Sequence, residues 1–243
     1  MGLVSRGCLL AGLLWNAGSL GGITRAAQSD RRVPGPPESL PDAAATGVSV
    51  PRITVLVYNY AGISLETVAE AELAANRIFE HAGIGTDWLV CPLYPYQAAD
   101  HPACLVTPGP ARLILRVTAE SMTQRMQPDQ ESFGFALQPE DGSFGTVANV
   151  FSDRARELVI RRRIAFGMML GHLMAHEVGH LLLSIGAHSS VGIMHVPWHN
   201  NELEMLQRGF MVFMPAEVER MRTSIRAREV AQRTLEATVV PGN

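Results

Sequence analysis

The sequence predicts an α+β fold in which a twisted mixed β-sheet packs on one long helix, with a further helix at the C-terminus. A continuous β-branched and apolar run at residues 53–58 has the composition of a strand covered on both faces. The segment from about 164 to 185 is apolar, almost uncharged and long enough for a buried helix. A short helix is predicted at 200–208, and Pro215 suits the first turn of a final amphipathic helix that reaches about residue 235.

A strand–helix–strand unit is predicted at the start of the sheet. Ser64 is a good N-cap for a helix whose apolar residues recur at helical spacing, and Gly83 with Ile84 suits a Schellman ending. Residues 86–91 then have the composition of a second strand. Two strands joined through a helix are expected to be parallel neighbours in one sheet.

A third strand and a hairpin are predicted to complete the sheet. Residues 113–117 form the third strand, and the runs 133–137 and 144–151 flank a turn at 139–142. A Ser-Asp pair then caps a helix over residues 152–163.

The chain is long enough for one well-packed domain with extensions, because 47% of its 243 residues are hydrophobic and 18% are charged. We predict a signal peptide over residues 1–27, since Arg6 precedes an apolar run and small residues follow at Ala26 and Ala27. Residues 28–51 are rich in proline and alanine and are predicted to be a flexible leader. The folded domain is expected to cover residues 52–243.

A signal peptide implies that the mature protein is secreted or periplasmic, with no stable membrane span once the signal is removed; a retained anchor is the alternative. Removal leaves two cysteines, Cys91 and Cys104, on either side of a proline-rich loop. An even pair of cysteines in an exported protein predicts one disulfide.

The charge balance argues against nucleic acid as the natural partner. The formal net charge is -3, and the chain has no dense basic block. Three consecutive arginines at 161–163 are explained by a solvated end of a helix. The sequence carries no signal for an oligomeric state.

Two histidines and a glutamate form the strongest candidate for a chemical site. His176 and His180 are four residues apart, so on a helix their imidazoles lie on one side and can bind one metal ion. Glu177 lies beside them in an almost uncharged segment, where an unpaired carboxylate is costly. Zinc hydrolases use this arrangement, in which neutral imidazoles bind Zn²⁺ and the carboxylate takes a proton from the water of the zinc site. The sequence therefore predicts one zinc ion with Glu177 as general base.

A third ligand has to come from outside this motif. His188 is the nearest candidate, because Gly186 can end the helix in a left-handed conformation and let the chain turn back. His172 lies on the same helix but about 12 Å from His180 along the axis, so it is expected to be a core histidine. Four other side chains stay open as ligands: His195, His199, Glu202 and Glu204.

Residues 176–194 resemble the metzincins, metallopeptidases with the pattern H-E-x-x-H-x-x-G-x-x-H followed by a turn that contains methionine. The resemblance implies that His188 is the third ligand and that Met194 lies under the metal as a structural residue. The gap between His180 and His188 is two residues longer than in the pattern. Leu183 stands where the pattern has its glycine, so Gly186 is expected to end the helix instead.

The domain also resembles a group of secreted bacterial proteins with a metzincin-like centre. Three stretches carry this similarity, which runs over about residues 52–230: residues 58–62, 133–136 and 148–151. The resemblance implies that residues 52–243 form a metzincin-like catalytic domain, with an antiparallel edge strand beside the cleft. The implied activity is that of a zinc-dependent endopeptidase acting on peptide or protein substrates.

Three other interpretations share the histidine pair. In a gluzincin the third ligand is a glutamate on a second helix, which Glu202 or Glu204 could supply. The segment 164–185 is apolar enough for a membrane-embedded zinc protease, with the arginines at 161–163 as its flank. A non-catalytic zinc-binding protein is the third, which Glu177 disfavours because structural zinc sites use four protein ligands and need no base.

Overall fold

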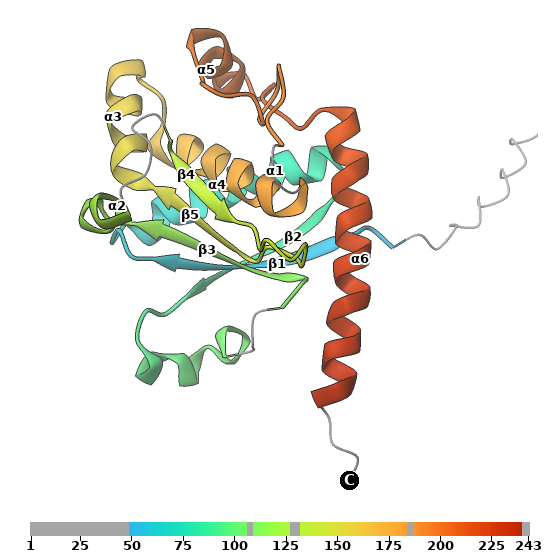
Figure 1. Ribbon diagram of the computed structural model, residues 1–243. Coiled ribbons are helices and arrows are strands. Elements are labelled where there is room, and N and C mark those ends of the chain that lie inside the picture. Colours follow the sequence, from blue (N-terminus) through green and yellow to red (C-terminus); the bar gives the residue numbers. More distant parts are fainter. Residues whose placement is uncertain (1–48, 106–108, 127–131, 184–186, 240–243) are drawn as a thin grey trace, which may run out of the picture. The chain divides into compact units, whose positions relative to one another are not determined.

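The structure is a computed structural model that describes four stretches of the chain, residues 49–105, 109–126, 132–183 and 187–239 (Figure 1). The chain divides between residues 47 and 48, and every element described below belongs to the unit that begins at Val48. The predicted signal peptide, nearly all of the predicted leader and Gly186 lie outside the described residues. Those assignments therefore stay predictions.

The described residues form strands and helices that alternate along the first half of the chain and are mainly helical in the second. The strands are β1 (Arg52–Asn59), β2 (Gly85–Cys91), β3 (Arg112–Thr118), β4 (Gly134–Leu137) and β5 (Val147–Phe151). The α-helices are α1 (Leu65–His81), α2 (Glu120–Met126), α3 (Ser152–Arg162), α4 (Phe166–Leu183), α5 (Asn200–Gln207) and α6 (Pro215–Val239). Two short 3₁₀ helices, η1 (Pro95–Asp100) and η2 (Pro102–Cys104), follow β2.

The five strands form one mixed sheet in the order β2-β1-β3-β5-β4. β1 pairs in parallel with β2 and β3, β3 pairs in parallel with β5, and β4 pairs antiparallel with β5. The predicted strand–helix–strand unit and hairpin are therefore confirmed, and so is the combination of a mixed sheet, a long apolar helix and a C-terminal helix. Most of the pairing is parallel because helical crossovers, rather than tight turns, join most of the strands.

The ends of α1 are those predicted. The hydroxyl oxygen of Ser64 accepts a hydrogen bond from the backbone N–H of Thr67. At the other end Gly83 has φ of 62°, and the N–H of Ile84 donates to the carbonyl of Phe79 over 2.9 Å. This is the Schellman pattern, which uses the left-handed freedom of glycine to pair the last carbonyls of the helix.

Two local features differ from the prediction. α2 follows β3 where no helix was expected, because this seven-residue segment has little apolar periodicity. The predicted cap of α3 is also wrong, since Phe151 occupies the N-cap position and Ser152 is already helical. The hydroxyl of Ser152 donates instead to the carbonyl of Thr118 at the end of β3, over 2.9 Å.

α1 and α4 cover one face of the sheet and pack closely on each other (Figure 1). Gly171 of α4 makes this approach possible, because a Cβ there would lie 2.7 Å from the Cβ of Ala74 and closer still to the carbonyl oxygen of Ala71. On the opposite face of β1 Leu56 is buried, whereas Tyr58 is half-buried. The predicted coverage of both faces of β1 therefore holds for Leu56 but not for Tyr58.

Among the described residues no helix is long and apolar enough to cross a membrane. Nearly all the side chains of α4 are shielded from solvent, in keeping with the apolar composition of this part of the chain.

α6 is joined to the rest of the domain by a buried arginine. Arg228 is 1% exposed, and its guanidinium lies over the ring of Phe144. It donates hydrogen bonds to the carbonyls of Pro110, Gly145 and Leu181. These three acceptors belong to the loop before β3, the β4–β5 connection and α4, so one side chain links three separate segments to α6.

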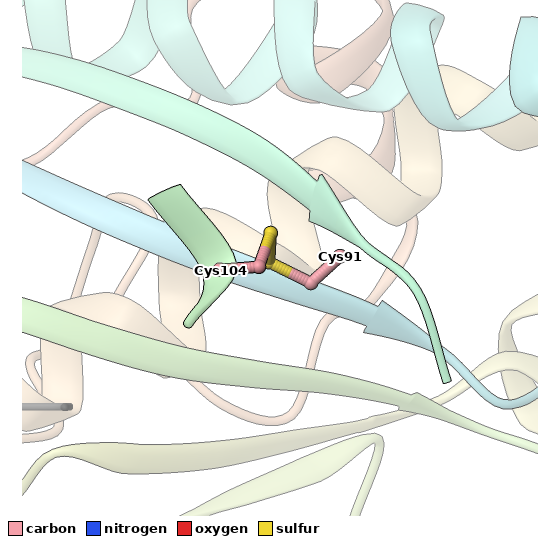
Figure 2. Close-up of a disulfide and its surroundings, with 2 residues drawn as sticks. All are labelled: Cys91 and Cys104. Atoms are coloured by element: carbon pink, nitrogen blue, oxygen red, sulfur yellow. A yellow bond between two sulfur atoms is a disulfide. The ribbon is translucent and has the colours of Figure 1, made fainter. Parts of the chain in front are cut away.

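The predicted disulfide is present. Figure 2 shows Cys91, at the end of β2, bonded to Cys104 of η2, with a distance of 5.6 Å between their Cα atoms. The bond closes a loop with a sequence separation of 13 and holds η2 against the end of β2.

Removing the disulfide is expected to lower stability. The double substitution Cys91→Ala/Cys104→Ala should reduce the free energy of unfolding by about 3 kcal/mol, because the unfolded chain regains the entropy of an open loop of this length. Urea denaturation of the oxidised parent and the variant measures the difference. A reductant should lower the stability of the parent to that of the variant and leave the variant unchanged; equal stabilities without reductant would contradict the prediction.

Removing the buried arginine is expected to have a similar effect. Arg228→Met should lower the free energy of unfolding by about 3 kcal/mol, because buried carbonyl groups lose their donors. Arg226→Met is the matched control, since Arg226 is exposed on the same helix; its effect should stay within about 0.5 kcal/mol. Equal losses for the two variants in urea denaturation would show that the contacts of Arg228 do not stabilise the fold.

Candidate metal centre

The end of α4 and the chain that follows it bring His176, His180 and His188 together. One ring nitrogen of each lies within 4.8 Å of those of the other two. The Nε2 atoms of His176 and His180 are 3.0 Å apart, as expected for residues one turn apart on a helix. The ring of His188 approaches that of His180 with a centroid distance of 4.7 Å. Within the described stretches no other group of three histidine, cysteine or acidic side chains could hold a metal ion.

This arrangement fits a zinc ion. Tetrahedral zinc with Zn–N bonds of about 2.0–2.1 Å places its ligand nitrogens about 3.3 Å apart. The observed nitrogen separations begin at 3.0 Å and stay within 4.8 Å, so small rotations of the rings suffice. All three donors are imidazoles, which are common ligands of zinc.

His176 is oriented by two contacts. Its Nδ1 lies 2.7 Å from the carbonyl oxygen of Ile193, and this acceptor requires that Nδ1 carries the proton. Nε2 therefore keeps its lone pair and faces the other two histidines. The ring of Trp198 packs edge-on against His176 with a centroid distance of 5.7 Å.

Burial keeps the three histidines neutral. It lowers the pKa of His176 to about 4 and that of His180 to about 3, and the neighbouring imidazoles lower both further. The pKa of His188 is also lowered, first by burial and then by His195. Because only neutral imidazole coordinates a metal, the site is ready to bind a cation at neutral pH.

The carboxyl group of Glu177 is the polar group that most needs a partner at this site. Glu177 is 4% exposed, and its Oε2 has no hydrogen-bond partner. Burial raises the pKa of this carboxyl to about 8. A nearby cation favours the ionised form, so a metal held by the histidines would also relieve the cost of burying the carboxylate.

Met194 lies against the site helix α4. It is fully buried, and a Cβ built on Gly179 would lie 2.8 Å from its sulfur atom. The turn that presents it is closed by the N–H of Ser189, which donates to the carbonyl of Met194 over 3.2 Å, and Gly192 adopts a φ of 83°. The side chain of Met194 thus occupies the space that a side chain at residue 179, directly before His180, would need.

The rival ligands have other partners. His172 donates through Nδ1 to the carbonyl of Met168, one turn earlier on α4. Glu202 accepts a hydrogen bond at the start of α5 and lies 3.8 Å from Nε2 of His195. Glu204 is exposed on the same helix. Among the described residues, no group of three potential ligands includes any of the five rivals: His172, His195, His199, Glu202 and Glu204.

Two residues at the site had no role in the sequence analysis. Gly134 of β4 lies against the carboxyl group of Glu177. Gln138, just after β4, donates through Nε2 to the carbonyl of His180 over 2.6 Å. Both are about 40 residues from their partners, so no local pattern could have revealed these contacts.

No protein-family model matches the chain, and no curated protein matches it. Among solved structures, the crystal structure of archaemetzincin from Methanopyrus kandleri is similar to this chain with a TM-score of 0.44 and 16% sequence identity. The similarity covers 72% of this chain and 96% of that chain. It is a remote likeness, and the account of the site depends on the residues described above.

Removal of His188 is expected to weaken zinc binding. The parent should retain about one zinc ion per chain, and His188→Ala should bind zinc at least about 100-fold more weakly, because two histidines remain to hold the ion. Metal analysis and competition with a chelator measure both quantities. Glu204→Ala, which replaces a rival ligand, should bind zinc as the parent does. Equal zinc affinity in His188→Ala and the parent would exclude the site of three histidines.

Proposed function

We propose that the protein is a zinc-dependent endopeptidase that hydrolyses peptide bonds in peptide or protein substrates. His176, His180 and His188 would hold one zinc ion, and Glu177 would act as the general base. The observation that carries this proposal is the buried carboxyl group with an unpartnered oxygen beside three convergent, neutral imidazoles. A purely structural zinc site has no need for such a group and closes with a fourth protein ligand.

The side chains of the site have separate roles in this proposal. A zinc ion bound there would supply a Lewis acid. Glu177 would accept a proton at Oε2, the oxygen without a partner, from the water whose oxygen bonds to the scissile carbonyl carbon, and would give the proton to the amine released when the C–N bond breaks. The bond from His176 to Ile193 keeps its ring in one orientation. Burial shields His176 and Glu177 from bulk water, which strengthens electrostatic interactions between them and a bound substrate.

The position of β4 supports a peptide as the substrate. β4 is the outer strand of the sheet and pairs with β5 on one side. An extended peptide can pair with the backbone of such an edge strand. Because Gly134 of β4 contacts the carboxyl group of Glu177, a peptide paired along this strand would pass close to the general base.

A location outside the cytoplasm, secreted or periplasmic, is part of the proposal. The disulfide between Cys91 and Cys104 supports it, because such bonds form and persist in oxidising compartments. Cleavage of the predicted signal peptide near residue 27 would release the enzyme there.

Loss of the general base is expected to abolish turnover. Glu177→Gln should lower kcat/KM on an unfolded protein substrate by at least about 1000-fold, because no carboxylate remains to accept the proton. Zinc content should stay at the level of the parent, since Glu177 is not a ligand. Glu204→Gln is the control and should keep full activity.

Two results would contradict the proposal in different ways. Full activity of Glu177→Gln would exclude Glu177 as the base. Failure of the zinc-loaded parent to cleave any member of a broad peptide library would favour a non-catalytic zinc-binding protein.

A further inference from the structure

β4 approaches the carboxyl group of Glu177 at a residue without a side chain. Gly134 is the first residue of β4 and is buried. A Cβ built on Gly134 would lie 2.6 Å from Oε1 and 2.7 Å from Cδ of Glu177. It would lie closer still to the backbone carbonyl oxygen of Asn149 on β5. A methyl group at this position therefore requires that the carboxyl group moves and that the backbone of β4 shifts relative to β5.

The two neighbours differ in how freely they can move. The backbone of Asn149 is fixed, because β5 pairs with β4 on one side and with β3 on the other. The side chain of Glu177 can rotate, but it lies in a packed interior and each new position costs contacts. A side chain at residue 134 would therefore strain the pairing with β5 and also displace the carboxyl group of Glu177.

We infer that Gly134 is a positioning residue for Glu177, because its missing side chain leaves the space in which the carboxyl group lies. The catalytic part of this inference rests on the proposed function. A second contact keeps the same spacing between strand and helix, since Gln138, just after β4, donates to the carbonyl of His180. β4 and the chain directly after it thus touch both the general base and a metal ligand of α4.

The coupling between Gly134 and Glu177 can be measured without metal or activity. Thermal unfolding in the presence of a chelator is compared for the parent, Gly134→Ala, Glu177→Ala and the double variant. Gly134→Ala should lower Tm in the parent and lower it much less when Glu177 is already alanine, because the colliding carboxyl group is absent. Alanine at residue 134 also lowers the entropy of the unfolded chain, but by the same amount whether residue 177 is glutamate or alanine. This contribution therefore cancels when the two changes in Tm are compared.

Each outcome of this comparison decides the inference. If Gly134→Ala fails to fold and the double variant folds, the coupling is supported. Equal losses of Tm in the two backgrounds would overturn the inference, because the contact with Asn149 alone would then explain the need for glycine. If neither Gly134→Ala nor the double variant folds, the inference is also overturned, because the contact with Asn149 then prevents folding whether or not the carboxyl group is present.

The effect on the reaction has its own matched control. Gly167 lies at the start of α4, and a Cβ there would lie 2.6 Å from the Cβ of Glu70 on α1. Gly167→Ala should therefore lower Tm but keep the kcat of the parent. Gly134→Ala should lower kcat about 100-fold, as expected for a misplaced catalytic group, while KM and zinc affinity stay unchanged.

A kcat for zinc-loaded Gly134→Ala equal to that of the parent would overturn the positioning role. If the parent itself cleaves no peptide, the proposed function fails, whereas the comparison of Tm values in the metal-free protein still decides whether Gly134 positions Glu177.

Discussion

The burial of Glu177 between α4 and β4 is the constraint on which the rest of the site depends. α4 packs on β4 and β5 and beside α1, and glycines at positions 171 and 179 let α1 and Met194 approach its backbone closely. This packing removes water from the imidazoles of His176 and His180, so they stay neutral, and it penalises the ionised carboxylate. A cation among the three histidines offsets that penalty. The packing of one apolar helix therefore sets the chemistry of the site.

The C-terminal end of α4 is held by side chains from distant parts of the chain. A helix leaves its last carbonyl groups without partners in the helix itself. Here Arg228 of α6 donates to the carbonyl of Leu181, and Arg220 of α6 donates to the carbonyl of Leu183. Gln138 donates to the carbonyl of His180. These bonds fix the last turn of α4, which carries His180, the second of the three convergent histidines. α6 and the β4–β5 hairpin thus take part in positioning the site, although neither supplies a ligand.

The features that depend on local spacing could be predicted from the sequence. The histidine pair follows from helical periodicity, and both ends of α1 follow from Ser64 and Gly83. The features that depend on tertiary contacts could not. Arg228 has the spacing of any residue in a polar helix, yet it is buried and joins three segments. Ser152 was assigned to a cap because of its residue type, but its hydroxyl finds a better acceptor on β3.

The central claim is that three histidines hold a zinc ion beside Glu177 and leave one coordination position open. A crystal structure of the zinc-loaded protein, with the ion located by its anomalous scattering, tests this claim most directly. The account predicts one zinc bound by His176, His180 and His188, with its fourth position not filled by a protein side chain. A zinc ion bound elsewhere, or closed by a fourth protein ligand such as Glu202, would contradict it.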